Sequence, residues 1–200
     1  IIGAKNLVEA SITNNVKKLI AISTDKAVNP INIYGSSKLT SDKIFLSSNN
    51  LSASKTKFSV TRYGNVIGSK GSIIDIYKNM IKNGSKFLPL TDPKMTRFFI
   101  SMDECISFIS NCLKIMRGGE IFIPKLPSVT IKDLVEVIAP ECEIDVISIR
   151  PGEKLHEVLV GVDESRNTIT QENRHIIQPV HPWWETNVEG DIFEADTYYG

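Results

Sequence analysis

The sequence is poor in cysteine, has no excess of either charge and contains no long apolar run. Its three cysteines, Cys105, Cys112 and Cys142, are odd in number and lack a CxxC spacing, so we expect neither a disulfide framework nor a zinc or other metal site. The 23 Lys and Arg residues are balanced by 23 Asp and Glu, which argues against a nucleic-acid partner. No stretch approaches the ~18 apolar residues of a transmembrane helix, and no signal peptide opens the chain, so a cytoplasmic protein without a membrane partner is expected.

The first residues point to a fragment. The chain has no initiator Met and begins directly in a helical pattern, with Leu7, Val8, Ala10 and Ile12 as its apolar positions. Its 200 residues, 42% of them hydrophobic, are enough for a core of one ordinary domain or two small ones.

Helix and strand patterns alternate in the first half of the chain. Residues 19–22 and 58–63 form short apolar runs typical of strands covered on both faces, and the pattern between them is helical over 34–48. Strands separated by helices predict an α/β fold with a parallel sheet, here the second half of a Rossmann-like sheet joined to a small α/β substrate-binding domain.

The second half gives a more mixed pattern. Helices are predicted over 73–82, 102–116 and 130–139, the last with Thr130 as its N-cap, and strands over 97–100, 120–124 and 144–149. Beyond Gly161 the patterns weaken, and an extended tail is expected from Trp183 to Gly200.

One segment, STDKAVNPINIYGSSK at residues 23–38, carries most of the chemical information. Tyr34 and Lys38 are four residues apart at the start of a helix and therefore share a face. A lysine ammonium stabilises a phenolate, which makes the tyrosine a usable base near neutral pH. Thr24 lies at the carboxyl end of a strand, the edge where ligands bind in open α/β sheets, and can hydrogen-bond a substrate oxygen.

Hydroxyl, tyrosine and lysine in this order resemble the extended short-chain dehydrogenase/reductase superfamily, which modifies nucleotide sugars. The pair Asp25 and Lys26 after the hydroxyl resembles the UDP-N-acetylglucosamine 4,6-dehydratases, and STDKAVNP with YGSSKLTSDKIF resembles their 5-inverting, pseudaminic-acid type. The resemblance implies NADP as cofactor, bound in part by Ser23, Thr24, Tyr34 and Lys38. It also implies a lyase in which Asp25 and Lys26 supply the acid and base that eliminate water.

Further matches imply a UDP-sugar substrate. RYGNVIGS at 62–69 resembles a family segment in which Asn65 contacts the substrate and Val66 the nicotinamide side. MTRF at 95–98 resembles an element near the uridine diphosphate, which places Arg97 there. RPGEKLHE at 150–157 resembles a loop in which Arg150 pairs with the diphosphate and Glu153 binds a ribose hydroxyl. Arginine suits the two negative charges of the diphosphate, and a carboxylate can accept hydrogen bonds from the ribose hydroxyls.

The glycine-rich dinucleotide fingerprint of the family is absent from these residues, so about a hundred residues are expected upstream, and the 200 residues alone should bind NADP poorly. No residue in these 200 distinguishes a preference for NADP from a preference for NAD. We expect residues 1–66 to belong to the cofactor domain, with 97–117 returning to it, and residues 67–96 and 118–200 to form the substrate domain and tail.

The resulting prediction is an NADP-dependent UDP-N-acetylglucosamine 4,6-dehydratase serving surface glycan or flagellin glycosylation, which the resemblance implies to be a homo-oligomer. Two alternatives remain. One is a UDP-hexose 4-epimerase or a retaining 4,6-dehydratase, and the other is a non-catalytic module that binds a UDP-sugar.

Overall fold

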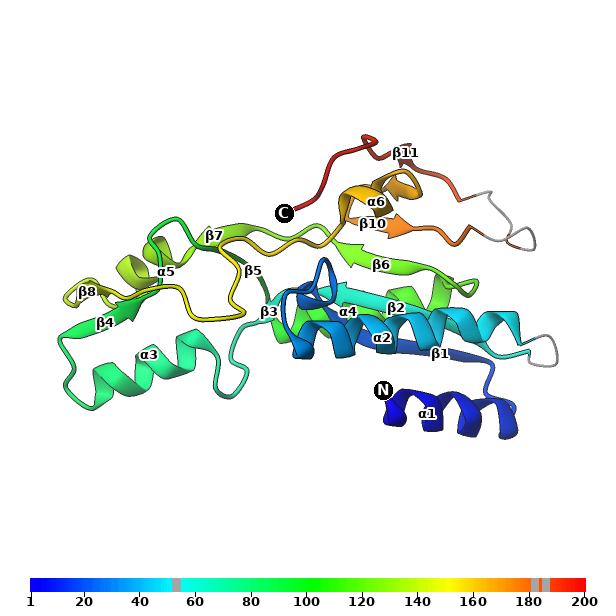
Figure 1. The fold of residues 1–200 in the computed structure, drawn as a ribbon, viewed down its shortest axis with the longest axis horizontal. Coiled ribbons are helices and arrows are strands. Elements are labelled where there is room, and N and C mark those ends of the chain that lie inside the picture. The colour runs from blue at the N-terminus through cyan, green and yellow to red at the C-terminus, as the bar shows by residue number, and fades with distance from the viewer. Residues whose placement is uncertain (52–54, 181–183, 185–187) are drawn as a thin grey trace. The chain divides into compact units, whose positions relative to one another are not determined.

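The computed structural model describes residues 1–51, 55–180, 184 and 188–200. Contacts divide the chain into two units (Figure 1). Unit 1 contains residues 1–63, 106–125 and 158–200, and unit 2 contains residues 64–105 and 126–157. Within the described residues no helix is both long and apolar enough to cross a membrane.

Unit 1 is built on a six-stranded sheet whose first three strands are parallel. Parallel pairing of neighbours that are separated in sequence by helices is the βαβ arrangement, so the predicted α/β fold class is confirmed. Three antiparallel strands extend the sheet beyond the third. In spatial order the strands are β1 (Lys18–Thr24), β2 (Lys57–Tyr63), β6 (Ile121–Pro124), β10 (Arg174–Ile177), β9 (Thr168–Thr170) and β11 (Asp191–Ile192).

The helices of unit 1 cover both faces of this sheet because side chains alternate along each strand. Ser23 of β1 points to the face covered by α2 (Ile33–Ser47), where it meets Asp42. Phe122 of β6 points to the other face and packs with Cys112 of α4 (Met102–Ile115). The remaining helical segments are α1 (Ile2–Thr13), α6 (Val162–Ser165) and two short 3-10 turns, η1 (Asp25–Ala27) and η2 (Ser48–Asn50).

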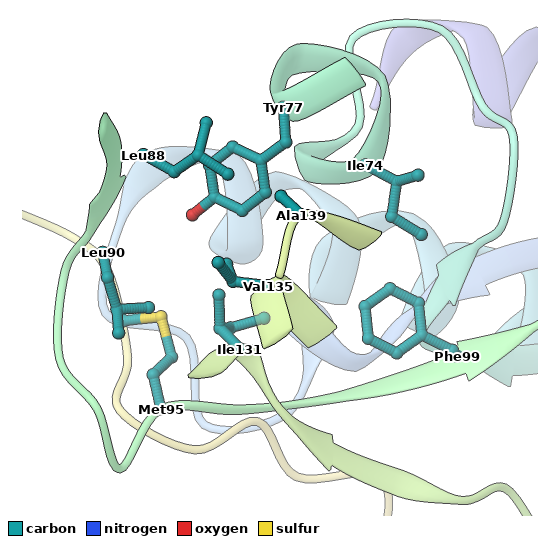
Figure 2. Packing of buried hydrophobic residues seen from close by; sticks show 9 residues of the cluster. All are labelled: Ile74, Tyr77, Leu88, Leu90, Met95, Phe99, Ile131, Val135 and Ala139. Atoms are coloured by element: carbon teal, nitrogen blue, oxygen red, sulfur yellow. The ribbon is translucent and has the colours of Figure 1, made fainter. Parts of the chain in front are cut away.

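Unit 2 has its own hydrophobic core, shown in Figure 2. Tyr77 from α3 (Ile73–Lys82) and Val135 from α5 (Ile131–Ile138) pack there with Leu88, Met95 and Phe99 from the strands and loops around them. Thr130 caps α5 by accepting a hydrogen bond from the Asp133 amide, as predicted. The strands form two small sheets, one with β3 (Asn65–Val66), β5 (Thr96–Ile100) and β7 (Ser128–Thr130), the other with β4 (Phe87–Leu90) and β8 (Glu143–Val146).

The structure confirms the predicted helices and strands up to residue 146 and adds strands that the sequence did not predict. Three of these, β3, β4 and β7, belong to unit 2, and β9, β10 and β11 lie beyond Gly161, where the apolar patterns are short and interrupted by charge. Of the expected tail, Trp183 falls outside the described residues, while β11 pairs with β9 and Tyr199 forms an isolated bridge with Val160.

The boundaries of the units also differ from the expected domain boundaries. Residues 118–125 and 158–200 lie in unit 1 because β6 pairs with β2 and β10 extends the same sheet. Of the segment 97–117, only residues 106–117 lie in unit 1.

Candidate active site

The predicted catalytic residues begin at the carboxyl end of β1. Thr24 is the last residue of the strand, and its side chain caps the following turn by accepting a hydrogen bond from the Lys26 amide at 3.4 Å. The Thr24 hydroxyl donates to Asp25 Oδ1 at 2.8 Å. The end of β1 therefore presents a hydroxyl, a carboxylate and an ammonium from three consecutive residues.

Asp25 and Lys26 form an ion pair with unequal exposure. Lys26 Nζ donates to Asp25 Oδ1 at 3.0 Å, and the lysine side chain is 36% exposed whereas the Asp25 side chain is 1% exposed. Asp25 Oδ2 is buried and has no hydrogen-bond partner among the described residues. Buried carboxylate oxygens are ordinarily hydrogen-bonded, so this oxygen is an exception to the usual pattern.

The start of α2 is held close to this turn. The Asn32 side chain caps the helix by accepting a hydrogen bond from the Gly35 amide at 2.8 Å. A Cβ at Gly35 would lie 2.4 Å from the Lys26 carbonyl oxygen and 2.8 Å from Pro30 Cβ. Only glycine permits so close an approach, and it is this approach that brings the first turn of α2 onto the segment carrying Asp25 and Lys26.

Tyr34 and Lys38 lie in the first turns of α2 and share a face, as predicted. Lys38 Nζ lies 5.7 Å from the centre of the Tyr34 ring, and the tyrosine is 54% exposed. The ammonium therefore lies beside the phenol ring, and the exposed ring can receive a ligand. Phenol and ammonium groups suit the ribose hydroxyls of a nicotinamide cofactor, so these residues fit the cofactor that the sequence implies.

In unit 2 the structure brings together three of the four predicted substrate-binding residues. Asn65 of β3, Arg97 of β5 and Glu153 line one cavity of about 140 Å³. Arg97 Nη2 lies 3.8 Å from Glu153 Oε1. Val66, predicted to face the nicotinamide, follows Asn65 at the end of β3 and pairs with Ile100.

Arg97 also holds the loop that contains Glu153. Its guanidinium donates to the carbonyl oxygens of Thr96, Leu155 and Lys154 at 2.7, 3.1 and 3.0 Å. Arg150 is exposed, and its main-chain amide donates to Glu153 Oε2 at 3.4 Å. The arginine side chain nearest this cavity is therefore largely committed to the backbone, while Arg150 keeps its side chain at the surface.

Sequence reasoning missed a buried polar network behind the end of β1. Ser23, which the resemblance places at the cofactor, donates its hydroxyl to Asp42 Oδ2 at 2.7 Å. Burial raises the pKa of Asp42, and the Ser23 hydrogen bond and the Arg62 charge only partly oppose it. Arg62 is paired with Glu164, and although burial opposes ionisation, this pairing holds the pKa of Glu164 below its usual value. The sequence did contain a signal for this network. Arg62 is a charged residue at an inward-facing position of a predicted strand, and charged residues are seldom buried unless they are paired.

Comparison with known proteins shows the family of the chain. Residues 1–179 match the model of the polysaccharide biosynthesis protein family. The chain is 51% identical over 178 residues to the UDP-N-acetylglucosamine 4,6-dehydratase (inverting) of Campylobacter jejuni, covering 88% of this chain and 53% of that protein. It is 40% identical to the UDP-glucose 4-epimerase of Rickettsia akari over 82% of this chain and 49% of that one.

A solved structure of Pen from Bacillus thuringiensis superposes with a TM-score of 0.88 at 32% identity, covering 100% of this chain and 61% of that chain. The chain thus spans about half the length of the curated relatives it matches. Because the family match covers nearly the whole chain, the chain belongs to the polysaccharide biosynthesis protein family.

Proposed function

We propose that the intact protein is an NADP-dependent UDP-N-acetylglucosamine 4,6-dehydratase that inverts C5. The observation that carries the proposal is the contact between Asp25 and Lys26 beside Thr24, at the edge where α/β sheets bind ligands. An acid and a base side by side are what elimination of water requires, and a simple dehydrogenase has no use for them.

Binding of the nucleotide is assigned to unit 2. Asn65, Arg97 and Glu153 line one cavity that offers an amide, a guanidinium and a carboxylate. The carboxylate suits ribose hydroxyls, and Arg97, although its guanidinium donates to backbone carbonyls, contributes its positive charge toward a diphosphate. The exposed Arg150 supplies a second cation for the diphosphate charge.

The first chemical step is oxidation at C4 of the sugar. Tyr34 removes the proton of the 4-hydroxyl, Thr24 hydrogen-bonds the same oxygen, and Lys38 stabilises the phenolate. NADP, held in part by Tyr34 and Lys38, supplies the hydride-accepting chemistry when it is bound. The resulting 4-ketone acidifies the proton at C5.

Elimination then uses the Asp25 and Lys26 pair. Moving one proton along the 3.0 Å contact from Nζ to Oδ1 converts the ion pair into a neutral amine and a carboxylic acid. The amine of Lys26 removes the C5 proton, and Asp25 protonates the departing C6 hydroxyl, which leaves as water. Return to C6 of the hydride taken from C4, and delivery of a solvent-derived proton to the opposite face of C5, complete a net loss of water, so the enzyme is a lyase.

The epimerase alternative is supported by the similarity to the Rickettsia akari protein. It is less favoured because an epimerase eliminates no water and so needs no acid and base pair such as Asp25 and Lys26. A retaining dehydratase would give the other configuration at C5, so product stereochemistry separates these activities. A module that binds UDP without NADP would support the non-catalytic alternative.

The biological setting belongs to the same proposal. We place the protein in the cytoplasm as a homo-oligomer that supplies a nucleotide sugar for pseudaminic-acid-type surface glycans. Family membership supports a polysaccharide pathway, and three unpaired cysteines suit a reducing compartment.

The substitution Lys26→Ala in the intact protein tests the proposal. With UDP-N-acetylglucosamine and NADP, the variant should still oxidise C4, seen as reduced nicotinamide, but should not exchange the C5 proton with deuterium from the solvent. Lys5→Ala, which removes an exposed lysine of α1, should leave both steps unchanged. Normal C5 exchange in the Lys26 variant would refute the assignment of the base.

A further inference from the structure

Four side chains that the proposed chemistry does not use form a polar chain inside unit 1. Ser23 of β1 donates to Asp42 of α2 at 2.7 Å, and the same carboxylate oxygen lies 3.9 Å from Arg62 Nη2 of β2. Arg62 donates to both carboxylate oxygens of Glu164 in α6, at 2.8 and 3.1 Å. Ser23, Asp42 and Arg62 are all buried, Arg62 to 1% exposure.

The chain of contacts links the two elements that carry the proposed catalytic groups. Ser23 directly precedes Thr24 on β1, and Asp42 lies one helical turn beyond Lys38 on α2. Arg62 is the register partner of Ser23 on the neighbouring strand. One hydrogen bond therefore joins the strand end with Thr24 to the helix with Tyr34 and Lys38.

Stability alone does not account for this network. Burying charged groups costs desolvation energy, and well-packed apolar residues of similar volume are often equally or more stabilising. Apolar packing, however, is non-directional and leaves a helix some freedom to shift over a sheet. A hydrogen bond has a preferred length and angle, so it defines where the helix sits.

Resting on the proposed function, we infer that Asp42 is a positioning residue: through Ser23 it sets α2 against the end of β1 and thereby aligns Tyr34 with Thr24. Arg62 balances the buried carboxylate, and the paired bonds to Glu164 keep its guanidinium in place. The Ser23 hydroxyl serves this internal contact rather than the cofactor.

Two matched serine substitutions in the intact protein test the inference. Ser23→Ala removes the 2.7 Å bond to Asp42, and Ser59→Ala removes a 2.6 Å bond to Glu120. Both serines are buried in neighbouring strands of one sheet and donate to buried carboxylates. Ser59 lies near the amino end of β2, away from Thr24. Both variants lose a buried hydrogen bond, but only Ser23→Ala should also lose the alignment of Tyr34 with Thr24.

The measurements are thermal stability, UDP affinity and the single-turnover rate of C4 oxidation with NADP and UDP-N-acetylglucosamine. Both variants should lose similar stability and bind UDP as the wild type does. The oxidation rate should fall about tenfold or more in Ser23→Ala alone, because small misplacements of reacting groups slow chemistry steeply. Equal oxidation rates in the two variants would overturn the inference.

A double-substitution cycle guards against a folding defect in one variant. Asp42→Ala leaves Arg62 paired with Glu164 and should slow oxidation as Ser23→Ala does, while the double variant should be no slower than either. If the two substitutions slowed oxidation independently, so that their rate losses multiplied in the double variant, Asp42 would not act through Ser23. Failure of the wild type to oxidise the sugar would overturn the proposed function and this inference with it. If the wild type oxidises the sugar and the two serine variants are slowed equally, the inference is overturned but the proposed function is not.

Discussion

Gly35→Ala is expected to slow catalysis while the protein remains folded. The added Cβ would lie 2.4 Å from the Lys26 carbonyl oxygen, whereas ordinary contact begins at 3.4 Å. The helix start or the turn must therefore move by about 1 Å. The second close neighbour, Pro30 Cβ at 2.8 Å, belongs to a ring and cannot rotate away.

The substitution has two expected effects, one on stability and one on the rate. Overpacking of this kind costs about 1–3 kcal/mol, and the better helix propensity of alanine offsets up to about 1 kcal/mol of that cost. The net loss of unfolding free energy should be about 0–3 kcal/mol. Because Tyr34 adjoins Gly35, a shift of about 1 Å misplaces the proposed base, and such misplacement can cost up to ~10²-fold in rate.

The assay is the single-turnover rate of C4 oxidation in the intact protein, together with denaturant unfolding. Gly3→Ala in α1 is the matched control, since a Cβ there meets nothing within 4 Å. It should increase stability by up to about 1 kcal/mol and leave the rate unchanged. An oxidation rate within about twofold of wild type for Gly35→Ala would refute the argument from close approach.

Two further substitutions test buried polar groups. Burial, with a smaller effect of Lys125, lowers the pKa of His175 to about 4. As the pH falls, His175 is therefore protonated in the unfolded chain before it is protonated in the folded protein. Unfolding free energy should fall between pH ~6.5 and ~4, by on the order of 2 kcal/mol at pH ~5. Denaturant unfolding of His175→Gln should lack this loss, and an unchanged pH dependence would contradict it. Lysine lacks the planar fork with which Arg97 reaches three carbonyls, so calorimetry of Arg97→Lys should show about 1–3 kcal/mol less stability, and equal stability would contradict the assigned bonds.

Local signals in the sequence were sufficient for most of the fold. The run that became β1 and the helical spacing that became α2 are properties of neighbouring residues, and so are the Thr130 cap and the shared face of Tyr34 and Lys38. The strands beyond Gly161 were not predicted because β9 and β10 are only three and four residues long. Such short strands depend on their partners in the sheet rather than on their own pattern.

By itself, then, the sequence determined the α/β class and proposed Thr24, Asp25 and Lys26 as site residues at the end of β1, because periodicity and motif spacing are local. Only the tertiary structure decided that Asp25 is buried beneath an exposed Lys26, and that Gly35 lies against the Lys26 carbonyl. It alone joined Ser23 to Asp42 and Arg62 to Glu164, residues 19 and 102 positions apart. Such contacts depend on how strands and helices pack, which no single stretch of sequence encodes.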